Sequence, residues 1–273
     1  MIFVGYNIQW GTGKDGRVDL PRIAGEIGAA DVIALQEVDR YWTRSHMADQ
    51  PAEFAALFPE HHWVYGPGMD MSAGEQRGRR RQFGNMVLAR APILASRNHM
   101  LPKMALAEGL SLQRAALEAV IEAPSGPLRV YSVHLNHSSA RERLAQIARL
   151  LDIIGAAGAE GGAWTGTRYN PVWELDGPQP PLPARAVVLG DFNLIPGSGE
   201  YAALSGGAGG LVDAWTALGH GLGAGPTFDG FRGNVRLDYA FVTPDLAANL
   251  RAISVDNDAQ GSDHQPIRIE IEL

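Results

Sequence analysis

Val187-Val188-Leu189-Gly190-Asp191-Phe192-Asn193-Leu194-Ile195-Pro196 is an apolar run that passes directly into polar residues. Three consecutive apolar residues are typical of a strand buried on both faces, and Gly190 would let the backbone approach a neighbouring group closely. Because side chains alternate along an extended chain, Asp191 and Asn193 should point to the same side. There a carboxylate and an amide can accept a proton from a water molecule and hold that molecule in place. The alternative is a turn in which both side chains cap the backbone.

Polar side chains also stand at the ends of other apolar runs. Each one alone is explained as a cap or a solvated turn residue, but functional residues concentrate where loops meet a rigid scaffold. As a set they therefore indicate an active site. Its members outside the central stretch are Asn7, Glu37, His134, Asp238, Asp263 and His264.

Many strands with a few amphipathic helices predict two packed sheets flanked by helices. Helices are expected at 18–29, 51–58 and 211–218, and another follows the capping-box pattern Ser139-Ala-Arg-Glu142. Strands are expected at 2–8, 31–37, 84–90, 93–100, 113–122, 127–135, 236–243, 250–256 and 266–272.

Two segments have an irregular composition within the single domain expected for residues 1–273. The range 66–82 is Gly-rich and reads as an exposed loop, either solvated or gripping a phosphate-rich substrate through Arg77, Arg79, Arg80 and Arg81. The range 155–183 is rich in Gly and Pro and contains Trp164, Tyr169 and Trp173. We expect it to be an insertion that forms a partly ordered flap near the site.

Composition limits the possible classes of function. The 273 residues are 45% hydrophobic and 19% charged, as in ordinary globular proteins. A net charge of −7 argues against a whole face that binds duplex DNA, although not against a local basic groove. The absence of cysteine excludes a thiolate metal site and a cysteine nucleophile. No apolar run reaches the roughly 18 residues that span a bilayer, and Met1 is followed at once by a core-like strand. We therefore expect a cytoplasmic monomer without stable membrane insertion.

Seven short motifs together resemble the endonuclease/exonuclease/phosphatase (DNase I-like) superfamily of metal-dependent phosphohydrolases. That superfamily includes nucleases, sphingomyelinases and inositol phosphatases, and the resemblance covers essentially the whole chain. It implies a four-layered α/β sandwich, α/β-β/α, with the active site at one rim of the two sheets. In chain order the motifs are Tyr6-Asn7-Ile8, Leu35-Gln36-Glu37-Val38, Gly84-Asn85-Met86-Val87-Leu88-Ala89-Arg90, Val133-His134-Leu135, Gly190-Asp191-Phe192-Asn193, Leu237-Asp238-Tyr239-Ala240-Phe241 and Ser262-Asp263-His264.

Phosphate-ester hydrolysis needs charge neutralisation, a positioned water and help for the leaving oxygen. We expect Glu37 to ligate Mg²⁺ or Mn²⁺, with Asn7 and Asp263 completing the protein's contribution directly or through water. Asp191 is the expected base, and Asn193 should help to hold the attacking water.

Two histidines complete the expected catalytic set. His264 should contact the phosphoryl oxygens, while Asp238 accepts its other ring N–H and fixes its tautomer. His134 stands where nuclease-like and sphingomyelinase-like members place a histidine, and would stabilise the transition state or protonate the leaving group. Abasic-site endonucleases are expected to have a tyrosine there. His137 is expected to be a surface or loop histidine.

Three further residues are candidate substrate contacts, and each has a structural alternative. Asn85 would contact the phosphate region or simply close a strand end. Arg114 and Arg44 would reach an anionic substrate or form surface salt bridges.

The predicted function is that of a metal-dependent phosphodiesterase or phosphatase. Its substrate is a phosphate ester, and the sequence leaves open a nucleic acid, a phospholipid headgroup or a small metabolite. A DNA-repair nuclease is an alternative, but the acidic net charge and His134 count against it. A catalytically silent binding module is another, and the presence of Glu37, Asp191 and His264 counts against that.

Overall fold

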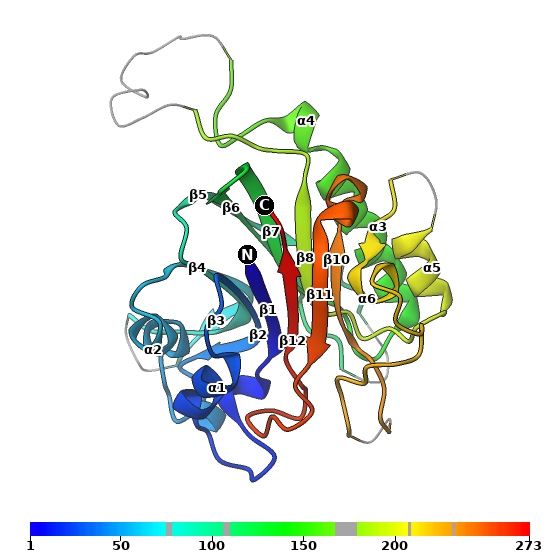
Figure 1. Cartoon of the computed structure of the whole chain (residues 1–273). Coiled ribbons are helices and arrows are strands. Elements are labelled where there is room, and N and C mark those ends of the chain that lie inside the picture. Colours follow the sequence, from blue (N-terminus) through cyan, green and yellow to red (C-terminus); the bar gives the residue numbers. More distant parts are fainter. Residues whose placement is uncertain (75–77, 106–109, 167–178, 207–208, 231–232) are drawn as a thin grey trace.

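The computed structural model describes residues 1–74, 78–105, 110–166, 179–206, 209–230 and 233–273. Two mixed six-stranded sheets pack face to face, and helices cover their outer faces (Figure 1). The expected four-layered α/β sandwich is therefore confirmed. None of the described helices is long and apolar enough to cross a membrane.

The first sheet has the strand order β11-β12-β1-β2-β4-β3. Its strands are β1 (Ile2–Asn7), β2 (Val32–Arg40), β3 (His62–Ser72), β4 (Arg80–Ala89), β11 (Leu250–Val255) and β12 (Ile267–Ile271). The second sheet has the order β5-β6-β7-β8-β10-β9. Its strands are β5 (Ile93–Met100), β6 (Ala115–Ala123), β7 (Gly126–His134), β8 (Ala186–Asp191), β9 (Val212–Asp213) and β10 (Asp238–Val242).

The helices begin at side-chain caps where the sequence offers them. Ser139 accepts a hydrogen bond from the backbone N–H of Glu142 and starts the longest helix. The Glu142 carboxylate does not complete the capping box, because it bonds Ser111 and Asn136 instead. The α-helices are α1 (Leu20–Ile27), α2 (Gln50–Leu57), α3 (Ala140–Gly155), α4 (Ala157–Glu160), α5 (Gly199–Ser205) and α6 (Ala214–Ala217). Only part of 211–218 is helical, because 212–213 pair with β10 as β9.

The hydrophobic core forms three layers, one between the two sheets and one on the outer face of each sheet. In β1, Phe3 belongs to the central layer between the sheets, whereas Val4 packs with α1. In β8, Val187 and Leu189 belong to the central layer, and Val188 packs with α3. Because both faces of these strands are buried, their sequences read as uninterrupted apolar runs.

The expectation of an exposed loop at 66–82 was wrong. Residues 62–72 and 80–89 pair as the antiparallel hairpin of β3 and β4. The glycines that suggested a loop serve a close approach of the two strands: a Cβ atom on Gly84 would lie 2.2 Å from the carbonyl oxygen of Gly66. Arg80 pairs with Asp70, Arg81 lies on β4, and Arg79 lies over the Tyr41 ring. Arg77 lies outside the described residues.

The described flanks of the 155–183 insertion do not form a flap over the polar strand ends. Arg97 donates to the carbonyl oxygen of Gly161 at 2.6 Å, and Arg185 donates to that of Pro127 at 2.8 Å. Arg185 directly precedes β8, whose other end is Asp191, so the flanks lie at the opposite end of the second sheet (Figure 1). Residues 167–178, which include Tyr169 and Trp173, lie outside the described part of the chain.

Candidate active site

Strand register brings the polar strand ends to one rim of the two sheets. In the second sheet, parallel β7 and β8 set His134 opposite Asp191, and antiparallel β8 and β10 set Asp191 opposite Asp238. In the first sheet, parallel β1 and β2 bring Asn7 beside the segment that carries Glu37. His134, Asp191 and Asp238 thus meet because their strands end at the same edge, whereas Glu37 lies within β2, which continues past the expected end at 37.

Gly190 makes the approach of β7 to β8 possible. Its φ is +151°, and a Cβ atom there would lie 1.9 Å from the carbonyl oxygen of Val133. The close approach expected from the sequence is therefore confirmed, and its partner is the strand that ends in His134.

The side chains of Asp191 and Asn193 meet, but not through the alternation of an extended strand, because β8 ends at Asp191 and Asn193 has a φ of 52°. The Asn193 amide donates to Asp191 Oδ2 at 3.0 Å, and its backbone N–H donates to Oδ1 at 2.9 Å. Asn7 adds a third donor to Oδ2, also at 3.0 Å. Asp191 is 2% exposed, and this burial raises the pKa of its carboxyl to about 7, with the nearby His264 opposing the rise.

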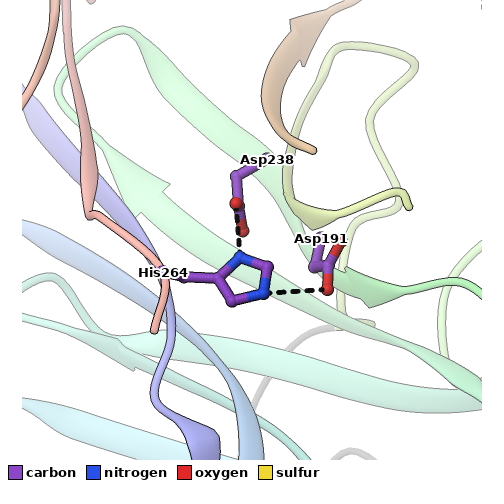
Figure 2. A group of neighbouring side chains, drawn as sticks. All are labelled: Asp191, Asp238 and His264. Atoms are coloured by element: carbon purple, nitrogen blue, oxygen red, sulfur yellow. Dashed lines mark hydrogen bonds and ion pairs between the residues drawn. The ribbon is translucent and has the colours of Figure 1, made fainter. Parts of the chain in front are cut away.

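His264 lies between two carboxylates (Figure 2). Its Nδ1 atom is 2.7 Å from Asp238 Oδ2, and its Nε2 atom is 3.8 Å from Asp191 Oδ2. Burial lowers the pKa of His264, but the charges of Asp238 and Asp191 outweigh burial and raise it above its ordinary value. The imidazolium is therefore the favoured form, with one N–H fixed on Asp238. Thr227 donates to the same Asp238 oxygen at 2.6 Å.

His134 has the opposite electrostatic setting. Arg114 Nη1 lies 3.0 Å from its Nδ1 atom and can only donate to it, while the Asn193 amide nitrogen lies 3.2 Å from its Nε2 atom. That atom lies 3.3 Å from Asp191 Oδ2. Burial and the Arg114 charge hold the pKa of His134 well below its ordinary value. His137 lies in the loop before α3, as expected, and its Nδ1 atom is 3.3 Å from Arg114 Nη2.

The three residues expected to hold a metal ion also meet at this rim. Glu37 has a positive φ of 60°, at a register shift in the pairing of β2 with β4. Its Oε2 atom is buried without a hydrogen-bond partner among the described residues, which fits a carboxylate oxygen reserved for a cation. Asn7 donates weakly to Glu37 Oε1 at 3.5 Å, and Gln9 donates to Asp263 Oδ2 at 3.0 Å.

A second group has ligand atoms close enough to bind a cation, because those of Asp191, Asp238 and His264 lie within 4.8 Å of one another. We interpret this group as a hydrogen-bonded chain and not as the metal centre. Both ring nitrogens of His264 already face carboxylates, and a metal ion on Nδ1 would have to break its bond to Asp238.

These residues surround one cavity of about 290 Å³. Glu37, Asp191, Asp263 and His264 line it, together with Arg44 and Arg114. The cavity is the common cleft that the sequence interpretation required. A polar floor in a hollow of this size can hold one phosphoryl group and a water molecule.

The sequence matches the family model described as "Endonuclease/Exonuclease/phosphatase family" over residues 4–264. The chain belongs to this family. The expected family membership is thereby confirmed. Its members are hydrolases that act on phosphate esters.

Solved structures of low sequence identity share the fold. An endonuclease/exonuclease/phosphatase from Beutenbergia cavernae has a TM-score of 0.71 and 22% identity, and the match covers 100% of this chain and 71% of that one. A mannosyl-6-phosphatase from Bacteroides thetaiotaomicron has a TM-score of 0.68 and 16% identity, with 100% of both chains covered. A 3′ phosphatase from Neisseria, bound to a product DNA hairpin, has a TM-score of 0.63 and 18% identity over 100% of both chains. No curated protein matched the sequence.

Two of the expected substrate contacts, Asn85 and Arg44, are held by bonds within the protein. Asn85 donates to the backbone carbonyl oxygens of Ala115 and Ser132, at 2.8 and 2.9 Å, and so ties the two sheets together. Asn85 lies in the interior of β4, so it does not close a strand end as the alternative supposed. Arg44 pairs with Asp39 at 2.9 Å and still lines the cavity.

The alternative of a surface salt bridge is wrong for Arg114. Its side chain is buried, with 4% of the residue exposed, and no carboxylate oxygen lies within the 4.0 Å of an ion pair in the described chain.

Sequence reasoning missed the apolar walls of the cavity. Of the residues that form them, only Leu237 stands in one of the seven motifs, because aromatic and aliphatic residues are equally common in cores. Location at the rim was the other available signal, although Phe83 lies in β4 and not on a loop. The residues are Trp10, Phe83, Leu110, Leu112, Phe228 and Leu237.

Proposed function

We propose that this protein is a phosphodiesterase that uses a divalent cation, Mg²⁺ or Mn²⁺, and an attacking water molecule. The observation that carries the proposal is the meeting of Glu37, Asp191 and His264 around one cavity. Membership of a family of phosphate-ester hydrolases supports the reaction class. The acidic net charge of −7 favours this function over that of a DNA-repair nuclease.

Asp191 is the proposed general base. Three N–H donors orient its carboxylate, and a pKa near 7 lets it accept a proton at physiological pH. The water oxygen forms the new bond to phosphorus as its proton passes to Asp191, and the bond from phosphorus to the leaving oxygen breaks. Asn193 would hold the attacking water through the amide that already bonds Asp191.

The two histidines are proposed to have different roles at the phosphoryl group. His264, protonated and fixed by Asp238, would place its Nε2–H on a phosphoryl oxygen and stabilise the charge that develops there. His134 is held neutral by burial and Arg114, so it suits hydrogen bonding to the transition state better than protonation of the leaving group. Arg114, buried without a carboxylate partner in the described chain, would neutralise the phosphoryl charge.

Glu37 is the proposed metal ligand, with Asn7 and Asp263 beside it. The buried, unbonded Oε2 atom of Glu37 supports this assignment, and hard cations take carboxylate oxygens while keeping several waters. A bound divalent cation would supply charge neutralisation at the phosphoryl oxygens. Asn7 Oδ1 already accepts from the Gln9 N–H at 3.1 Å, so its contact would share that oxygen or run through water.

Hydrolysis of bis-p-nitrophenyl phosphate tests the proposal. We expect turnover with Mg²⁺ or Mn²⁺ and none in EDTA, with activity returning when the metal is restored. Folded protein that releases no nitrophenolate under any metal condition would instead favour the silent binding module.

A further inference from the structure

Two arginines line the cavity, and their charges are not equivalent. Arg44 donates through Nε and Nη2 to both oxygens of Asp39, which is 0% exposed, so the pair is close to neutral. Arg114 has no such carboxylate in the described chain, and its Nη1 and Nη2 atoms lie within hydrogen-bond distance of His134 and His137. One arginine can therefore neutralise an anion, whereas the other can only offer a polar contact.

Three aromatic rings surround the guanidinium of Arg44. Its guanidinium carbon lies 4.2 Å from the Trp10 ring centroid, 4.9 Å from that of Trp42 and 5.2 Å from that of Phe83. Asp39 accepts from Nε and Nη2, and Nη1 has no hydrogen-bond partner among the described residues. Arg44 lines the cavity, so Nη1 is the nitrogen that remains for a ligand there. Such a rigid donor at a cavity wall determines specificity more than affinity.

The backbone beneath Arg44 and Trp10 is strained and then fixed by buried groups. Trp10 has a φ of 47°, in the left-handed region that a bulky residue rarely adopts. Gln50, which is 0% exposed, donates to the Trp10 carbonyl oxygen at 2.6 Å and accepts from the Asp39 N–H at 2.9 Å. Strain of this kind persists where the surrounding structure holds it for a functional purpose.

Two cations outside the cavity, Arg80 and Lys14, already have carboxylate partners. Arg80 pairs with Asp70 at 2.6 Å, and Lys14 pairs with Asp229 at 2.9 Å. A polyanion would have to break such pairs to bind through these cations. A cavity of about 290 Å³ with apolar walls also suits one small group better than a polymer.

We propose that the substrate is a small organic ester with a single phosphate, whose neutral, hydroxyl-bearing group lies against Arg44 and Trp10. Arg114 binds the phosphoryl group, and the Nη1 edge of Arg44 donates to a hydroxyl oxygen. The apolar C–H groups of the same moiety pack on Trp10. The inference rests on the proposed hydrolysis and adds to it the class of substrate.

A matched set of diesters tests this, because all release the same nitrophenolate. The compounds are glyceryl p-nitrophenyl phosphate, propyl p-nitrophenyl phosphate, which has the same carbon chain without hydroxyls, and thymidine 5′-p-nitrophenyl phosphate. We expect kcat/KM for the glyceryl ester to exceed that for the propyl ester by about tenfold, the value of one good hydrogen bond. Equal values for the two esters in the wild-type protein would overturn the proposal. A preference for the thymidine ester would replace it with a site for a planar base.

The Arg44→Lys variant tests whether Arg44 causes the preference for the glyceryl ester over the propyl ester. Lysine keeps the charge but loses the planar fork, so the glyceryl ester should lose its advantage mainly through a higher KM. Arg80→Gln is the control, since Arg80 pairs with Asp70 on the exposed hairpin, and it should retain the wild-type preference. An Arg44→Lys protein that keeps the full preference would show that another group recognises the hydroxyls.

Salt dependence separates a small substrate from a polymer. A small monoanionic ester carries no condensed counterions, so log kcat/KM should depend only weakly on log salt between about 50 and 200 mM. A single-stranded polymer should instead give a slope of about −0.7 for each phosphate that the protein neutralises. A single-stranded oligonucleotide hydrolysed faster than the glyceryl ester, with a steep slope, would overturn the inference and leave the proposed hydrolysis standing. Failure to hydrolyse any of these esters with metal would overturn both.

Discussion

Two buried carboxylates of the same sheet, Asp191 and Glu118, have opposite environments. Glu118 is 1% exposed and accepts hydrogen bonds from Tyr131 at 2.6 Å and from His99 at 3.0 Å. The fully buried Arg129 donates to the same Tyr131 hydroxyl at 2.8 Å. Burial raises the pKa of Glu118, but the bonds from His99 and Tyr131 outweigh burial and hold the pKa below its ordinary value.

Asp191 instead shares its surroundings with other carboxylates. Burial raises its pKa, the Asp238 and Glu37 charges add to the rise, and His264 only partly compensates. The comparison teaches that burial alone does not mark a functional carboxylate. Where donors and cations are in excess, the charged form stabilises the fold. Where carboxylates are in excess, the site is strained electrostatically and suits a cation or a proton transfer.

The largest effect is expected for Asp191→Asn. Loss of the base should lower kcat for bis-p-nitrophenyl phosphate by about 10²- to 10⁴-fold. Urea unfolding should show a folded protein, because the amide keeps the shape and removes a buried charge, although it weakens the hydrogen bonds that Asn7 and Asn193 donate to the carboxylate. An enzyme that retains a tenth of its activity would contradict the assignment of the base.

Glu37→Gln should remove the metal-supported reaction while leaving the fold intact. Calorimetric titration with Mn²⁺ should show affinity lower by more than about 100-fold, since even an outer-shell partner is worth 10- to 100-fold. Glu118→Gln is the matched control, another buried glutamate outside the cavity. Undiminished turnover of Glu37→Gln at equal Mg²⁺ would refute its role as a ligand.

Glu118→Gln should show the reverse pattern. We expect the free energy of unfolding to fall by about 1–3 kcal/mol, because His99 and Tyr131 lose a charged acceptor. Both kcat and KM should stay close to wild type. A loss of activity that exceeds the loss of folded protein would mean that the network of Glu118 reaches the cavity.

The smallest effects are the opposite pH dependences of the two carboxylates in metal-free protein. The lowered pKa of Glu118 contributes stability above its ordinary value of 4.5, and this contribution is lost as the pH falls through the folded-state pKa. The raised pKa of Asp191 makes its ionisation cost stability as the pH rises from 3.8 through about 7. Denaturation across this range should therefore show that the free energy of unfolding of Asp191→Asn rises relative to that of wild type as the pH rises. The free energy of unfolding of Glu118→Gln should approach that of wild type as the pH falls.

The sequence predicted the residues of the site better than it predicted the segments around them. Asp191, His134 and Asp238 each stand at the end of an apolar run, and strands that end at one edge bring such residues together. The β3–β4 hairpin was missed because Gly66 and Gly84 read as loop signals, although they permit the close approach of two strands. The described flanks of 155–183 lie away from the site, because composition shows that an insertion exists but not at which end of the sheet it lies.

The sequence by itself determined the double-sheet fold and the polar strand ends, because strands buried on both faces must be apolar until they reach the rim. Tertiary structure alone decided the environments of those residues. Nothing local to Arg44 and Arg114 shows that one is neutralised by Asp39 and the other is buried beside two histidines. Charge, pKa and cavity shape depend on groups brought together from distant parts of the chain, and only folding sets those distances.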